Sequence, residues 1–185
     1  MLKLGVIADT HIPDRARKMP ARVFKLFAQE EVDAILHAGD ICTRRVLQQL
    51  GEVAQVYAVR GNRDWFIPEL KMSVKLQFEE VTIGMTHGHG SGWGYVLDKL
   101  HLLVHGPHKF DHVEKKVQRI LADCDVMVFG HSHVPVNRWQ EGRLLFNPGS
   151  ACCPNVFVRN ATRTAGLITV DGSQVQGEIV DITDG

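Results

Sequence analysis

The sequence is short of the features that mark exported, membrane-bound or nucleic-acid-binding proteins. It has no net charge, because 21 lysines and arginines balance 21 aspartates and glutamates, so long nucleic acids and anionic membranes are disfavoured as partners. No apolar run is long enough to cross a bilayer, and the first residues lack a cleavage-site pattern. The cysteines show no CxxC spacing; they are Cys42, Cys124, Cys152 and Cys153. We therefore expect a reduced, cytoplasmic protein without membrane contact.

What is present is a regular series of short apolar segments. They predict strands near residues 2–8, 32–38, 55–61, 81–88, 125–131, 143–150, 165–172 and 174–182. Between the first three, residues 19–31 and 43–53 have apolar side chains at helical spacing, which indicates a β-α-β-α-β unit with a parallel sheet. The last two strands flank DGSQ, a composition typical of an antiparallel hairpin. With 185 residues, we expect one domain over residues 1–185, with two packed sheets and helices outside.

Polar residues follow most of these strands, at the point where each strand ends. They are Asp9 and His11, Asp40, Asn62 and Asp64, His87 and His89, His131 and His133, and Asn147. Taken singly, each has an ordinary explanation, such as a turn or a buried histidine. Ligands of α/β proteins bind beyond the carboxyl ends of strands, so we expect these groups to converge there. Carboxylate, imidazole and amide groups together favour a transition-metal site over a Ca²⁺ or Mg²⁺ site.

The motifs that carry these residues are DTH (9–11), GD (39–40), GNRD (61–64), THGH (86–89) and GHSH (130–133). In this order they resemble the signature of the calcineurin-like metallophosphoesterases, and the match spans residues 5 to 150. The chain is most similar to the small bacterial and archaeal phosphodiesterases of that superfamily. The resemblance implies an α/β fold, a four-layer αββα sandwich of two mixed β-sheets flanked by helices. It also implies two divalent transition-metal ions per chain, with Mn²⁺ favoured over Fe, Zn, Ni or Co.

The resemblance also assigns the metal ligands. Carried over motif by motif, the ligands are Asp9, His11 and His133 at the first metal, Asn62, His87 and His131 at the second, and Asp40 as a bridge. Two metals that share a carboxylate and a hydroxide can lower the pKa of that water and bind both the attacking and the leaving oxygen of a phosphoryl group. We therefore expect hydrolysis of a small phosphodiester, with Asp40 and Asn62 among the catalytic residues.

Position 63 departs from the family pattern. Many active members have GNHD or GNHE there, with a histidine that is thought to protonate the leaving group, whereas this chain has Arg63. A guanidinium is a poor acid near neutrality but can bind phosphate oxygens, so Arg63 is interpreted as a phosphate clamp or as a solvated loop residue. His89 is the candidate replacement acid. Asp64 is expected either to orient a ligand or to cap a helix before residues 65–70.

Other functions remain open. The retromer subunit with a similar fold serves mainly in protein contacts and has a motif similar to residues 9–15, so a catalytically weak scaffold is the chief alternative. The intact GD and GN motifs favour the enzyme. A nuclease is disfavoured by the zero net charge and the absence of a basic aromatic stripe. Residues 92–120 are expected to form two helices that could serve as a lid or as a contact surface in a homo-oligomer.

Overall fold

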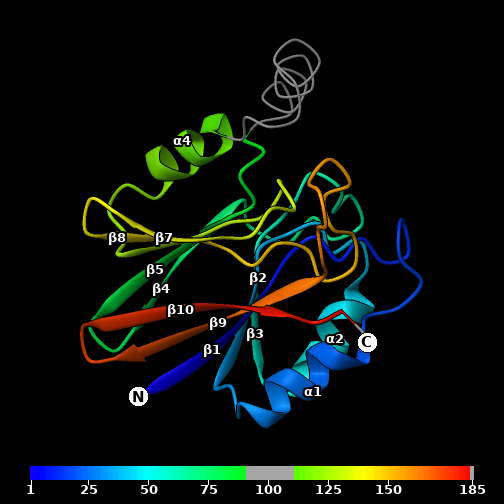
Figure 1. Cartoon of the computed structure of the whole chain (residues 1–185), viewed down its shortest axis with the longest axis horizontal. Coiled ribbons are helices and arrows are strands. Elements are labelled where there is room, and N and C mark those ends of the chain that lie inside the picture. The colour runs from blue at the N-terminus through cyan, green and yellow to red at the C-terminus, as the bar shows by residue number, and fades with distance from the viewer. Residues whose placement is uncertain (91–110, 184–185) are drawn as a thin grey trace.

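Two five-stranded sheets face each other in the structure (Figure 1), a computed structural model that describes residues 1–90 and 111–183. The first sheet has the order β10-β9-β1-β2-β3 and consists of β1 (Leu2–Ile7), β2 (Ala34–His37), β3 (Gln55–Ala58), β9 (Thr164–Asp171) and β10 (Gln174–Asp181). The second has the order β4-β5-β6-β8-β7 and consists of β4 (Ser73–Phe78), β5 (Val81–Thr86), β6 (Val126–Val128), β7 (Val136–Gln140) and β8 (Arg143–Asn147). Both sheets combine parallel and antiparallel pairs, so both are mixed.

Helices cover the outer face of each sheet and so complete four layers (Figure 1). Alternation along β1 places Leu4 and Val6 in the apolar layer between the sheets and Ile7 in the layer beneath the helices. On the first sheet, α1 (Ala21–Gln29) and α2 (Arg44–Gly51) pack through buried side chains such as Phe27 and Leu50. On the second, α4 (Asp111–Ile120) packs through Val113 and Val117. The predicted αββα sandwich is therefore confirmed.

The sequence patterns miss two strands, β4 and β7. Both lie at an edge of the second sheet, and their residues are exposed or only partly buried, as at Lys75 and Arg138. Edge strands carry polar side chains that discourage pairing with other chains, so they lack the apolar run by which the buried strands were recognised. The eight strands that the sequence predicts are all present, with the parallel β1-β2-β3 unit and the antiparallel β9-β10 hairpin.

The expected helical pair in residues 92–120 is described only in part. Residues 91–110 lie outside the described residues, and with them the first expected helix. The second corresponds to α4, whose apolar face packs on the second sheet. The expected lid or contact surface falls largely on residues outside the described ones and stays a prediction. In the described part of the chain, no helix has the length and apolarity needed to span a membrane. All four cysteines are free thiols.

Candidate metal centre

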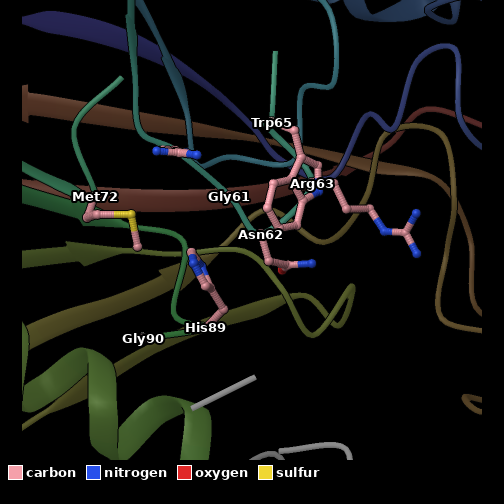
Figure 2. A pocket seen from close by; sticks show the side chains of 8 residues that line it. Gly61, Asn62, Arg63, Trp65, Met72, His89 and Gly90 are labelled. Atoms are coloured by element: carbon pink, nitrogen blue, oxygen red, sulfur yellow. The ribbon is translucent and has the colours of Figure 1, made fainter. Parts of the chain in front are cut away.

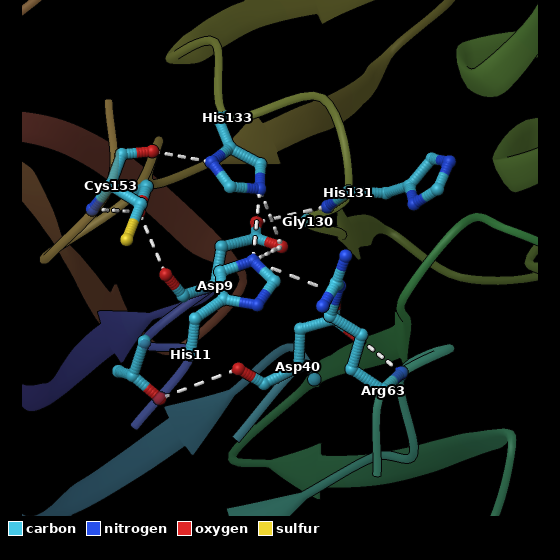
Figure 3. A network of polar contacts seen from close by, with 12 residues as sticks. Asp9, His11, Asp40, Arg63, Gly130, His131, His133 and Cys153 are labelled. Atoms are coloured by element: carbon cyan, nitrogen blue, oxygen red, sulfur yellow. Dashed lines mark hydrogen bonds and ion pairs between the residues drawn. The ribbon is translucent and has the colours of Figure 1, made fainter. Parts of the chain in front are cut away.

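The seven predicted ligands meet at one edge of the two sheets, in the turns that follow β1, β2, β3, β5 and β6. Figure 3 shows five of them together: Asp9, His11, Asp40, His131 and His133. All seven are buried or partly buried. The convergence that the strand-end positions predict is thus observed, with ligands arriving from both sheets.

Five of these residues have a left-handed backbone, which side chains other than glycine rarely adopt. The φ angles are 53° at Asp9, 50° at His11, 55° at Asp40, 71° at His131 and 55° at His133. Each such residue costs on the order of 1–3 kcal/mol and persists only where its surroundings fix it. Here the backbones of the first two turns hold each other, since the Asp9 N–H donates to the Gly39 carbonyl at 3.0 Å and the His11 N–H to the Asp40 carbonyl at 2.9 Å. Strain concentrated in this way is typical of functional sites.

The first group of ligand atoms surrounds His11. Its Nε2 lies 3.1 Å from His133 Nε2, 3.8 Å from Asp9 Oδ1 and 3.6 Å from Asp40 Oδ2. His133 Nε2 is in turn 3.4 Å from Asp9 Oδ1. One ion placed among these atoms would have two imidazole nitrogens and two carboxylate oxygens as neighbours.

The second group surrounds Asn62. Its Oδ1 lies 3.1 Å from His87 Nε2 and 3.1 Å from His131 Nδ1. His87 Nε2 is 3.5 Å from Asp40 Oδ1, so the two oxygens of Asp40 face different groups. This arrangement is the one that a bridging carboxylate requires.

A buried oxygen without a hydrogen-bond partner, together with the residue types, indicates that these residues fit a metal centre. Asp9 Oδ1 is buried and has no hydrogen-bond partner, although a buried carboxylate oxygen is costly unless it is paired or bound to a metal. This oxygen also lies 3.9 Å from His87 Nε2. A cation between these atoms would bind this oxygen and the neighbouring imidazole nitrogens.

Backbone carbonyls orient two of the imidazoles for metal binding. His87 Nδ1 lies 2.8 Å from the Ala38 carbonyl, and His133 Nδ1 contacts the Cys153 carbonyl (Figure 3). A carbonyl can only accept, so each Nδ1 carries a proton and each Nε2 faces the site. Metal-binding histidines are commonly held by a second partner of this kind.

Burial shifts the pKa values of the ionisable groups in the centre. Burial raises the pKa of Asp9. Burial would also raise the pKa of Asp40, but the charge and hydrogen bond of His87 outweigh it and hold that pKa well below the usual range. Burial lowers the pKa of His11 to about 3, and burial with the charge of His87 lowers that of His131. These two imidazoles are therefore neutral near pH 7, the form that binds metals.

His87 is the exception among the histidines of the centre. Burial lowers its pKa, but the Asp40 carboxylate, by charge and hydrogen bond, and the Asp9 carboxylate raise it to about 9. Without a metal, His87 therefore carries a proton near neutrality. A metal that binds its Nε2 must displace that proton.

Asp64 holds the second and third turns together. Its carboxylate is fully buried and accepts N–H groups from Asp40 at 3.0 Å, Ile41 at 2.7 Å, Cys42 at 2.7 Å and Gly61 at 2.7 Å. Asp64 thereby fixes the backbone of the predicted ligand Asp40, which agrees with the first of the two expected roles. The helix-cap interpretation is wrong, because residues 65–70 form turns.

Two residues at and after the end of β8 support the predicted ligands: Asn147, which the sequence placed at this edge without a role, and Ser150, which sequence reasoning missed. The Ser150 hydroxyl donates to the Asp9 carbonyl at 2.7 Å. The Asn147 amide donates to the Gly130 carbonyl at 3.0 Å and to Ser132 Oγ at 3.1 Å, which shapes the turn that carries His131 and His133. The available signal was the polar NPGS run directly after an apolar strand, at the same edge as the ligands.

His37 is a second supporting residue without a role in the sequence-based assignment. It is fully buried at the end of β2, where its Nδ1 accepts the Gly39 N–H at 3.2 Å and its Nε2 lies 3.2 Å from Thr10 Oγ1. It thereby connects the turns after β1 and β2. A histidine in an otherwise apolar strand, two residues before the GD motif, was the signal for it.

A pocket of about 490 Å³ adjoins the centre (Figure 2). It is lined by Arg60, Gly61, Asn62, Arg63, Trp65, Met72, His89 and Gly90. His89 Nδ1 is buried without a hydrogen-bond partner, and burial together with the charge of His87 lowers the pKa of His89 to about 4. The predicted ligand Asn62 is part of the pocket wall, so the pocket adjoins the candidate centre.

Arg63 is positioned through its backbone and its side chain. Its N–H donates to Asp40 Oδ1 at 2.8 Å, and its guanidinium forms an ion pair with Asp14. In Figure 2 the guanidinium points away from His89. The arginine is therefore not a freely solvated loop residue, and its role as a phosphate clamp stays a prediction that requires the pair with Asp14 to open.

Comparisons with known proteins agree with these features. The model of the calcineurin-like phosphoesterase superfamily domain matches residues 2–173. A "Probable metallophosphoesterase" of Methanothermobacter thermautotrophicus is 32% identical over 178 residues, which cover 96% of this chain and 91% of that protein.

Two solved structures show the same fold. Vps29 of Entamoeba histolytica, in complex with Zn²⁺, is similar with a TM-score of 0.70 and 22% identity, over 98% of this chain and 100% of that chain. A novel archaeal phosphodiesterase is similar with a TM-score of 0.65 and 20% identity, over 97% of this chain and 100% of that chain. At these identities the likeness supports the fold alone.

Proposed function

Because the chain belongs to the calcineurin-like phosphoesterase superfamily, we propose that it is a phosphodiesterase that hydrolyses a small phosphodiester with two divalent metal ions. The observation that carries the proposal is the arrangement of two ligand groups around the two oxygens of Asp40. The buried, unpartnered oxygen of Asp9 supports it further.

The proposed ligands divide into two sets with one shared member. Asp9, His11 and His133 would hold one ion, Asn62, His87 and His131 the other, and Asp40 both. Mixed carboxylate, imidazole and amide donors suit Mn²⁺, which we propose as the ion. When bound, divalent ions would polarise a phosphoryl group and make water more acidic.

The residues around the centre have separate proposed tasks. Asp40 is held as an anion, and Asn62 adds a neutral oxygen, so the loaded site would keep positive charge for a phosphate ester. His89 lines the pocket, and its pKa of about 4 would rise beside the negative charge of a bound phosphate, so we assign it proton transfer to the leaving oxygen. Arg63, once released from Asp14, would bind phosphate oxygens.

The proposed substrate is small. A pocket of about 490 Å³ lies within the size range of small-molecule sites. The zero net charge of the chain gives no support to binding of a long nucleic acid.

A scaffold is the second candidate function, and the likeness of the fold to Vps29 favours it. An assay of hydrolysis distinguishes the scaffold from the phosphodiesterase. The Mn²⁺-loaded protein is expected to hydrolyse bis(4-nitrophenyl) phosphate, faster than 4-nitrophenyl phosphate, and to lose this activity with a chelator. If the protein loaded with Mn²⁺, Zn²⁺, Ni²⁺, Co²⁺ or Fe²⁺ hydrolyses neither ester, the scaffold is favoured; faster hydrolysis of the monoester would make the protein a phosphomonoesterase.

A further inference from the structure

The pocket beside the centre has one wall that the proposed reaction does not explain. Trp65 is 73% exposed and Met72 is 45% exposed, although both are large apolar side chains that usually find cover. Figure 2 shows the Trp65 ring on the opposite side of the pocket from His89. An exposed apolar surface beside a polar site is typical of ligand binding.

Trp65 is exposed on a segment whose backbone is fixed. Directly before it, Asp64 is buried and accepts four backbone N–H groups. Two residues after it, Ile67 is 1% exposed and donates its N–H to the Asp64 carbonyl at 3.2 Å. The ring therefore projects from a turn whose backbone is held on both sides, so that little backbone freedom would be lost when a ligand binds against it.

The ring is also close to the place where a phosphate would bind. Trp65 follows the ligand Asn62 by three residues, so their Cα atoms are at most about 11 Å apart. Arg60 and Arg63 line the same pocket, and the Arg63 guanidinium is paired with Asp14 until a phosphate releases it. One wall of the pocket thus fits a flat apolar group, and the adjoining wall fits an anion.

From this juxtaposition we propose that the pocket is a subsite for a planar aromatic group, such as a nucleobase, that is attached to the scissile phosphate and stacks on Trp65. The proposal rests on the proposed phosphodiesterase function and narrows its substrate to phosphodiesters with such a group. An alkyl substituent of the same volume would fill the pocket but would not stack on the ring. Stacking of a base on an aromatic side chain changes affinity by about 5- to 150-fold.

Equilibrium binding to the Mn²⁺-loaded protein tests the subsite without turnover. The probes are adenosine 5′-monophosphate and ribose 5-phosphate, which share the phosphate and the sugar and differ in the base. We expect adenosine monophosphate to bind at least about 5-fold tighter. Trp65→Ala is expected to remove this difference and to leave ribose phosphate affinity unchanged, whereas Trp65→Phe retains most of it.

Trp139 provides the matched control. It is 56% exposed on the edge strand β7 and is not part of the pocket wall, so Trp139→Ala should leave both affinities unchanged. Equal affinity of the unaltered protein for the two probes would overturn the proposal, and so would an equal loss of both affinities in Trp65→Ala. Neither result would affect the proposed hydrolysis of diesters, which fails on a different observation, the absence of turnover.

Turnover gives a second, independent readout. Two diesters with equally acidic leaving groups, one a substituted phenol and the other a fluorinated alcohol, separate stacking from leaving-group chemistry. The aryl diester is expected to have the lower KM, and Trp65→Ala to raise that KM to the value for the alkyl diester. Equal KM values in the unaltered protein would contradict the subsite.

Discussion

Asp40 is the residue on which the proposed centre depends most, because its two oxygens face different ligand groups. Asp40→Ala should remove the shared ligand from both, and metal charge stabilisation contributes several kcal/mol in comparable enzymes. We expect kcat/KM for a diester to fall at least ~10³-fold and the bound metal to fall with it. Metal content and kinetics measure this. Asp171→Ala, at a side chain that is 72% exposed, is the control and should change neither; an active, metal-loaded Asp40→Ala protein would contradict the assignment.

His89 is the residue to which we assign proton transfer. General acid catalysis typically contributes ~10²–10⁴-fold, and it matters most for leaving groups that are poorly acidic. His89→Gln should therefore slow an alkyl diester by ~10²-fold or more while changing 4-nitrophenolate release little. A series of leaving groups, followed as kcat/KM against leaving-group pKa, measures the change of slope. If the slope is the same in both proteins, His89 is not the acid.

At the residue scale, the order of the motifs was enough to predict which side chains come together, because each motif follows a strand that ends at the same edge. The sequence did not show what surrounds each side chain. Arg63 could be interpreted as a clamp, but its ion pair with Asp14 joins turns that are 49 residues apart and has no local signature. The supporting contacts of Ser150 and His37 are likewise long-range, and only the packed fold brings them together.

At the scale of elements, the turns after β2 and β3 act as one unit because Asp64 joins them. Asp64→Asn has nearly the same shape but replaces one accepting oxygen by an NH₂ group that faces N–H donors. Buried donors without partners cost about 1–3 kcal/mol. We expect the free energy of unfolding to fall by this amount in denaturant titrations and metal affinity to fall ~10- to 100-fold.

The control for Asp64→Asn is Asp125→Asn. Asp125 also accepts a backbone N–H, from Thr82 at 2.8 Å, but in an exposed position. It should lose less than about 1 kcal/mol and retain metal affinity. Equal effects of the two substitutions would show that Asp64 does not position the centre.

Strands and helices were predictable where their buried residues form an apolar pattern in the sequence. The central strand β6 is short, yet all three of its residues are buried and apolar. The edge strands β4 and β7 are longer but have few buried residues, and pairing with β5 and β8 forms them. Their existence depends on partner strands, which local patterns do not reveal.

At the scale of the whole molecule, the buried histidines make the stability of the metal-free protein depend on pH. Burial, followed by the charge of His87, lowers the pKa of His37 to about 3. The unfolded chain therefore binds a proton between pH 6.5 and 3 that the folded chain does not. Stability from His37 is present above pH 6.5 and is lost as the pH falls towards 3, at up to ~1.4 kcal/mol per pH unit.

His37→Gln is expected to reduce the slope of the free energy of unfolding against pH below pH 6.5, by up to the ~1.4 kcal/mol per pH unit that one proton contributes. Denaturant titrations of metal-free protein between pH 7 and pH 4 measure the slope. An unaltered slope in His37→Gln would show that this histidine is not kept neutral by the fold.

The central claim is that two metal ions bind at the shared edge of the two sheets and share Asp40. Anomalous X-ray diffraction from crystals grown with Mn²⁺ tests it most directly. The account predicts two peaks about 3.5–4 Å apart, one beside Asp9, His11 and His133 and the other beside Asn62, His87 and His131, with Asp40 in contact with both. A single peak, or no peak among these residues, would contradict it.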